Sequence, residues 1–236
     1  MLKEEVSANV LLMLLCYVYI LFIIFVSSRM IRVMSISQKA SRKFLHAMIG
    51  NLLFAIPFFT SNIYPVLVAA PFILITLLAS SYSPFKHTSG RLKGLADITE
   101  GGHPLGLVFY AVSYTFLAMF FASKPYVIAA GILPMAYGDS VASIVGEKYG
   151  RRKYKLIADK SLEGSMVMFF ASLLSFTGSL FFFSLLYSFP VFEKIFPAFA
   201  VATMTTLVES ASPLGFDNLT VPFFGASTFL FLGGGM

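Results

Sequence analysis

Four acidic residues lie at the ends of long apolar segments in the second half of the chain. Asp139 comes late in one segment, Glu163 opens the next, Glu209 closes another and Asp217 opens the last. Placing a charged side chain in lipid costs at least about 2.5–3.5 kcal/mol on insertion scales. If successive segments cross a membrane in alternating directions, all four carboxylates reach one depth. We interpret them as a functional cluster; the alternative is solvation of helix ends or packing of neutral, hydrogen-bonded carboxyl groups.

Carboxylates at one level beside a basic loop favour binding of a divalent cation and phosphates. Mg²⁺ prefers oxygen ligands and usually takes one or two carboxylates together with substrate phosphates. Lysine and arginine then neutralise the remaining phosphate charge. The loop 148–160 joins the Asp139 segment to the Glu163 segment, and its candidate phosphate ligands are Arg151, Arg152, Lys155 and Lys160.

The segment around Asp139 also predicts a close contact between helices. Gly138, Ala142 and Gly146 recur every four residues and form a helix face of small residues, which another helix can approach closely. Asp139 is adjacent to this face, and Ser143 lies one turn further along. We therefore expect Asp139 to lie where two helices meet.

The sequence from Lys160 to Ser165 predicts a helix start. Ser161 is a suitable N-cap, and the helix dipole favours an acid such as Glu163 in the first turn. The free N–H groups of a helix start, next to a lysine and the small residues Gly164 and Ser165, can also hold phosphate. The Walker pattern is absent, so this is not a P-loop.

A second basic group lies near the start of the chain. Arg42, Lys43 and His46 fall on about one helical face at the predicted cytoplasmic end of an apolar segment. Two roles explain Arg42 and Lys43 equally well: anchoring of the helix at the membrane surface and binding of phosphate. His46, one turn deeper, is explained less readily by anchoring.

The elements that position these residues must be membrane helices. Of the 236 residues, 58% are apolar and 12% are charged, against roughly 45–50% and 25% in soluble domains. The net charge of +6 does not indicate nucleic-acid binding, because the bases lie between apolar runs and not on one solvated face. We predict an all-α, polytopic helix bundle that forms a single transmembrane domain over 1–236, without a soluble domain. The about eight expected spans are 6–27, 44–60, 63–82, 105–122, 125–146, 163–188, 191–209 and 217–234.

The distribution of basic residues predicts the orientation of these spans. All but three of the 17 lysines and arginines fall in the loops on one side; the exceptions are Lys3, Lys124 and Lys194. Cytoplasmic loops carry the excess of lysine and arginine. We therefore expect the acidic cluster at the cytoplasmic face and both termini on the other side.

Four segments together resemble the dolichol kinase and phytol kinase family. They are Arg42-Lys43-x-x-His46, Gly138–Gly146, Lys160–Ser165, and Glu209 followed by Phe216-Asp217-Asn218-Leu-Thr-Val-Pro222, and they span 42–222. The resemblance implies a CTP-dependent kinase of a long-chain isoprenoid alcohol, in a minimal microbial or archaeal version without the extra spans of the eukaryotic dolichol kinases. The acceptor could be dolichol, a polyprenol, geranylgeraniol or phytol, and the membrane would be the plasma membrane of a prokaryote.

The resemblance and the residues together give an expected division of roles. Asp139 or Glu163 accepts the proton of the alcohol, and Mg²⁺ is held by Asp139 with Glu209, Asp217 or Asn218. CTP phosphates contact the two basic groups and the helix starts, at Arg42, Lys43, His46, Gly138, Ser143, Arg151, Arg152, Lys155, Lys160, Ser161, Gly164 and Ser165. The alternatives are a CDP-lipid synthase-type cytidylyltransferase and an ion-coupled transporter, whose acids would instead lie near the membrane midplane.

Overall fold

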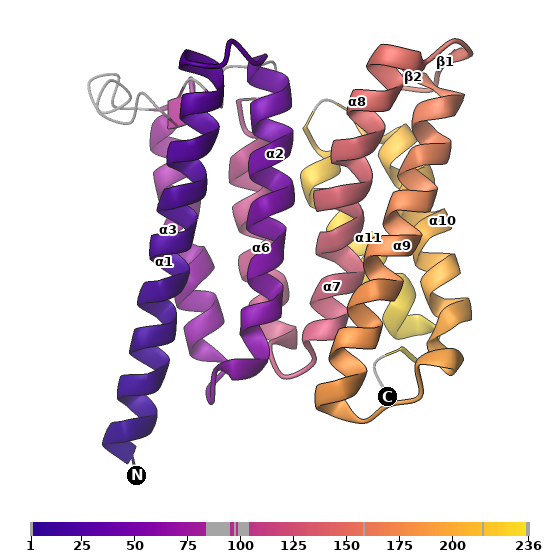
Figure 1. The fold of residues 1–236 in the computed structure, drawn as a ribbon. Helices are drawn as coiled ribbons and strands as arrows, with labels where there is room; N and C mark the ends of the chain where they lie inside the picture. Colours follow the sequence, from indigo (N-terminus) through magenta and orange to yellow (C-terminus); the bar gives the residue numbers. More distant parts are fainter. Residues whose placement is uncertain are drawn as a thin grey trace. The chain divides into compact units, whose positions relative to one another are not determined.

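The structure is a computed structural model that describes residues 2–83, 95, 96, 98, 104–157, 159–213 and 215–234. The chain divides into two compact units, Met1–Ser123 and Lys124–Met236. Each unit is a bundle of helices that lie side by side (Figure 1). Three of the basic residues assigned to the predicted cytoplasmic loops, Lys86, Arg91 and Lys93, lie outside the described residues.

The described part of the first unit is helical. Helix α3 packs against α6, and α1 packs against both α2 and α3. Helix α2 begins where the hydroxyl of Ser37 accepts a hydrogen bond from the backbone N–H of Ala40, at 3.2 Å. The described helices are α1 (Leu2–Arg32), α2 (Gln38–Gly50), its 3₁₀ continuation η1 (Asn51–Phe58), α3 (Ile63–Ala79) and α6 (Gly106–Phe121).

The second unit is organised around one helical rod. The rod consists of α7 (Pro125–Leu133), the π-helical turn η2 (Pro134–Asp139) and α8 (Ser140–Tyr149). A hairpin of β1 (Lys153–Lys155) and β2 (Asp159–Ser161) follows, with Tyr154 opposite Lys160. In Figure 1 it lies at the end of the bundle where α8 stops and the next helix begins. The remaining elements are α9 (Leu162–Tyr187), η3 (Val191–Lys194), α10 (Ile195–Ala211) and α11 (Asp217–Phe231).

Glycines allow the rod to lie very close to its neighbours. A Cβ atom added at Gly131 of α7 would be 2.3 Å from the backbone oxygen of Pro222 on α11. One added at Gly138 would be 2.2 Å from the hydroxyl of Ser172 on α9. Gly146 of α8 faces Gly164 of α9, with 3.4 Å from its added Cβ to the Gly164 Cα. The close helix contact predicted from Gly138, Ala142 and Gly146 is therefore confirmed.

The predicted all-helical class is confirmed, with the short hairpin β1–β2 as an addition that the sequence analysis did not anticipate. Among the residues that the structure describes, four helices are long and apolar enough to cross a membrane: Glu4–Arg32, Pro125–Tyr149, Leu162–Tyr187 and Val191–Ala211. Ile63–Ala79 and Gly106–Phe121 are apolar but shorter. Eight crossings, outward-facing termini and a single membrane domain stay predictions.

Candidate active site

An ion pair between Lys160 and Glu209 lies at the centre of the candidate site. The ammonium group of Lys160, on β2, donates to the carboxylate Oε1 of Glu209, in the last turn of α10. The side chain of Glu209 is 5% exposed and that of Lys160 is 26% exposed. The pair thus joins the hairpin to the end of α10, and it remains within reach of solvent on the lysine side.

Two further carboxylates act on the same lysine. Burial of the Lys160 ammonium opposes its charge, but the charge and hydrogen bond of Glu209 outweigh this, and Asp139 and Asp217 add to the attraction. The pKa of Lys160 is therefore raised above the ordinary value for lysine. Asp139 and Asp217 are therefore near enough to the Lys160–Glu209 ion pair for their charges to act on it.

The π-helical turn places Asp139 inside the unit. Asp139 ends η2 and is 3% exposed. This turn packs against α9, α10 and α11. Single π-helical turns within α-helices occur frequently at functional sites, because the extra residue redirects side chains.

Asp217 and Asn218 begin α11 beside this group. The Asp217 carboxylate accepts the backbone N–H of Asn218 at 3.0 Å and the Asn218 side-chain amide at 3.2 Å. The same amide donates to the backbone oxygen of Gly215 at 3.2 Å. These contacts fix the start of α11 and present an Asp oxygen next to an amide.

Glu163 has a different local role from the other three acids. Its carboxylate accepts the backbone N–H groups of Arg151 at 3.1 Å and Arg152 at 3.2 Å. It thereby ties the start of the hairpin to the first turn of α9. The proton-accepting role expected for Glu163 stays a prediction, and the contacts in the structure indicate that it positions the hairpin.

The other residues that were predicted to bind phosphate at the start of α9 also hold the hairpin in place. The Ser161 hydroxyl caps α9 by accepting the N–H of Gly164 at 3.2 Å, as the sequence predicted. The hydroxyl groups of Tyr154 and Ser165 are 2.5 Å apart. The sequence analysis did not single out Tyr154, because three residues are too few to show the alternation of a strand. Arg151, Arg152 and Lys155 are exposed, and Ser143 is half-buried on α8.

The other predicted basic group belongs to the first unit. Arg42, Lys43 and His46 are 5%, 7% and 1% exposed, which is unusual for residues that only anchor a helix at a surface. The imidazole of His46 stacks on the ring of Tyr110, with 4.8 Å between ring centroids. The Tyr110 hydroxyl donates to the backbone oxygen of His46 at 3.1 Å.

The acidic residues suit a magnesium ion that is coordinated partly by nucleotide phosphates. They suit a metal ion coordinated by protein ligands alone less well. Among the described residues, no three His, Cys, Asp or Glu side chains form a group that could hold a metal ion. Mg²⁺ in phosphate-transferring sites usually needs only one or two carboxylates, with the phosphates and water completing its shell. Asp139, Asp217 and Glu209 offer oxygen ligands of this kind.

Comparison with known proteins identifies relatives of one enzymatic class. The chain is 39% identical over 125 residues to the phytol kinase of Synechocystis sp., which covers 52% of each protein. It is 30% identical over 200 residues to the probable phytol kinase 2 of Oryza sativa, covering 78% of this chain and 63% of the rice protein. It is also 29% identical over 162 residues to the dolichol kinase of Saccharomyces cerevisiae, covering 64% of this chain and 30% of the yeast protein.

The chain is a homologue of the phytol and dolichol kinases. The resemblance of the chain to this family is thereby confirmed, and the relatives are phytol and dolichol kinases by name. This phytol and dolichol kinase homologue spans between about half and two thirds of the length of the phytol kinases described above. No family model matches the chain, and no solved structure matches it.

Proposed function

We propose that the protein is a membrane kinase that transfers the γ-phosphate of CTP to an isoprenoid alcohol, giving the isoprenyl monophosphate and CDP. The observation that carries the proposal is the buried Glu209 paired with Lys160, within electrostatic reach of Asp139 and Asp217, in a homologue of phytol and dolichol kinases. The magnesium cofactor, the choice of CTP and the location at the cytoplasmic face of a prokaryotic plasma membrane are parts of the same proposal.

Phosphoryl transfer needs positioning and charge neutralisation more than covalent help from the protein. The alcohol oxygen forms a bond to the γ-phosphorus while the bond to the β–γ bridging oxygen breaks, and CDP leaves. Bound magnesium would neutralise charge on the β- and γ-phosphates, held by Asp139 and by Asp217 or Glu209.

The residues of the chain perform the remaining steps. Lys160 stays protonated at neutral pH because its pKa is raised, so it can attract the phosphates. Asp139 is buried on the π-helical turn and is suited to accept the proton that the alcohol loses. Glu163 holds the hairpin that carries Lys160 through the backbone N–H groups of Arg151 and Arg152.

The test uses the purified protein in detergent with phytol or a polyprenol and CTP labelled at either end of the triphosphate. Label from the γ-position in the lipid product supports the kinase. Label from the α-position would instead identify a cytidylyltransferase, and no labelled lipid with any nucleotide would contradict both. Unlabelled ATP, GTP and UTP as competitors test the choice of base.

A further inference from the structure

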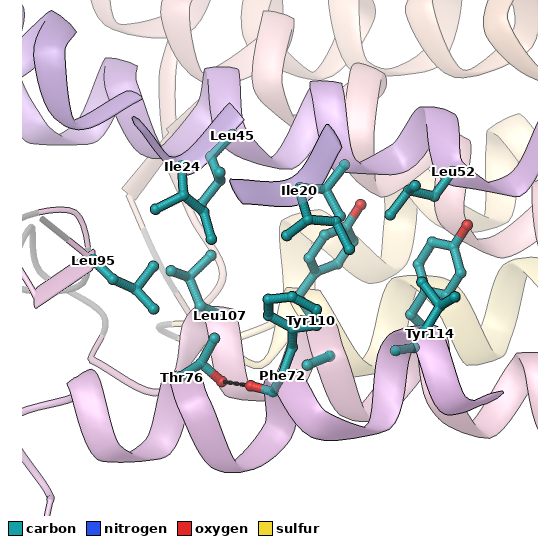
Figure 2. Close-up of a pocket in the computed structure, with 14 residues that line it drawn as sticks. Ile20, Ile24, Leu45, Leu52, Phe72, Thr76, Leu95, Leu107, Tyr110 and Tyr114 are labelled. Atoms are coloured by element: carbon teal, nitrogen blue, oxygen red, sulfur yellow. Dashed lines mark hydrogen bonds between the residues drawn. The ribbon is translucent and has the colours of Figure 1, made fainter. Parts of the chain in front are cut away.

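The first unit contains an apolar cavity between its helices. Pockets lined mainly by hydrophobic side chains are the usual binding sites of small molecules. Its walls come from α1, α2, η1, α3 and α6 of one unit (Figure 2). Aliphatic and aromatic side chains supply most of the lining, among them Ile20, Leu45, Leu52, Phe72 and Leu107.

The cavity is elongated along the helices. One end is lined by Ile24, Leu45 and Leu107, and the other by Leu52 and Tyr114, which follow further along the same elements or their continuation (Figure 2). Leu107 and Tyr114 are separated by two helical turns, or about 10 Å of helix axis. A slender apolar chain that lies parallel to the helices fits this shape better than a compact ring system.

The two ends of the cavity differ in their surroundings. Leu45 lies in the same helical turn as Arg42, Lys43 and His46, which are all buried. Tyr110 lines the cavity and also stacks on His46. The end near Leu45 is thus next to buried basic groups, whereas the described residues that line the end near Tyr114 include no charged side chain.

The polar atoms along the wall give a ligand little to bind. The Thr76 hydroxyl donates to the backbone oxygen of Phe72 at 2.6 Å, and the Tyr110 hydroxyl donates to that of His46 at 3.1 Å. The Tyr114 hydroxyl is buried and makes no hydrogen bond with the described part of the chain. Recognition must therefore rest on apolar contact along the cavity and on charge at its Leu45 end.

We propose that this cavity binds the isoprenoid chain of the acceptor, with the alcohol end toward Arg42 and His46 and with Tyr114 closing the far end. This inference rests on the proposed function, because it assigns the place of that function's lipid substrate. It makes Tyr114 a specificity-determining residue, since its ring sets the length of chain that the cavity encloses.

Photolabelling tests the location without requiring phosphate transfer. The full chain in phosphatidylglycerol nanodiscs is irradiated with a farnesol analogue that carries a diazirine on its terminal isoprene unit. Adducts mapped by mass spectrometry are expected near Tyr114 and Leu52, and excess phytol should remove them. Adducts confined to the lipid-facing surface, or adducts that phytol leaves unchanged, would overturn the proposal in favour of an ordinary membrane lipid.

A matched pair of substitutions on α3 tests the same point by kinetics. Ala69 lines the cavity, whereas the next residue, Ala70, is absent from the lining. Changing the fit by even one methylene in an apolar site alters recognition by about 10–200-fold. Ala69→Leu should raise the KM for phytol at least about tenfold and leave the KM for CTP unchanged, whereas Ala70→Leu should change neither. Equal effects of both variants would contradict the assignment.

Chain-length preference tests the role of Tyr114. Tyr114→Ala should improve kcat/KM for a longer polyprenol relative to farnesol by about tenfold. Tyr114→Phe should keep the native preference, because the hydroxyl lacks a partner among the described residues. An unchanged preference in a folded Tyr114→Ala protein would remove Tyr114 from the site.

Labelling in the cavity without any kinase activity would contradict only the proposed function, and kinase activity with labelling elsewhere would contradict only the cavity.

Discussion

At the scale of single residues, the proposed function depends on Lys160 and on the three carboxylates whose charges act on it. Glu209 pairs directly with Lys160, while Asp139 and Asp217 act on it through their charge. Magnesium and a triphosphate would redistribute these charges, because the metal adds positive charge at the acids and the phosphates attract the lysine. The acids and the lysine therefore have separable roles, which substitution can distinguish.

The first prediction concerns Asp139. Asp139→Asn keeps the size and much of the hydrogen bonding but removes the charge, so kinase activity should fall at least about 100-fold, or roughly 2.7 kcal/mol of transition-state stabilisation. The protein should still fold, because a neutral amide is less costly to bury than a carboxylate. Turnover and thermal unfolding in detergent measure both effects. Glu147→Gln, on the exposed side of the same rod, is the control and should keep full activity. Near-normal turnover in Asp139→Asn would exclude a role of Asp139 in binding metal.

The second prediction concerns Lys160. Lys160→Ala leaves the buried Glu209 without its ammonium partner, so stability should fall by about 1–3 kcal/mol, and the KM for CTP should rise more than that for the alcohol. The double variant Lys160→Met with Glu209→Gln removes both charges and should regain stability without regaining activity. Thermal unfolding and separate CTP and alcohol kinetics report the two effects. Lys153→Ala, an exposed lysine of the same hairpin, is the control. Unchanged kinetics in Lys160→Ala would place this lysine outside the site.

Most members of the acidic group are recognisable in the amino-acid sequence. A charge at the end of an apolar segment is costly, and this cost makes Asp139, Glu209 and Asp217 stand out among the apolar residues around them. The role of Glu163 could not be predicted in the same way. Its partners are backbone N–H groups, which carry no sequence signal, so only the folded hairpin reveals them.

At the scale of elements, the rod formed by α7, η2 and α8 positions the chemistry. Apolar length and the spacing of Gly138, Ala142 and Gly146 predicted a closely packed helix here. The π-helical turn at Asp139 was not predictable, because it depends on how α9, α10 and α11 pack around it. The hairpin was also missed, since two strands of three residues are too short to show a clear alternation.

The third prediction tests this packing with two glycines. Gly131→Ala would bring a Cβ to 2.3 Å from the backbone oxygen of Pro222, which cannot move without shifting α11. We expect a loss of about 1–3 kcal/mol in stability from overpacking, together with reduced activity as the start of α11 shifts. Gly178→Ala on α9 is the matched control, because nothing lies within 4 Å of its added Cβ. It should stabilise the helix by up to about 1 kcal/mol. Equal unfolding temperatures for the two variants would contradict the close contact of α7 and α11.

At the scale of the whole molecule, the number of membrane crossings decides on which side each loop lies. Within the described part of the chain, four helices meet the length and apolarity that a crossing requires. Helices α3, α6 and α11 have 17, 16 and 15 residues, which extend only about 22–26 Å, against a hydrocarbon core of about 30 Å. Short apolar helices cross when the bilayer thins locally or when flanking residues reach the interface.

The last prediction follows from the distribution of charge. Lysine and arginine concentrate in alternate loops, and such loops stay in the cytoplasm. With eight crossings, reporters fused at Gly90 and at Arg152 should both report the cytoplasm, and one fused after Met236 should report the opposite side. The lysine-poor turn at Lys124, between α6 and α7, should also report the opposite side and serves as the internal control. If one short helix fails to cross, every reporter after it changes side, so a cytoplasmic signal after Met236 would contradict eight crossings. The first reporter along the chain that changes side would then identify the helix that does not cross. A non-cytoplasmic signal at Arg152 would place the Lys160 hairpin on the side of the membrane opposite to cytoplasmic CTP.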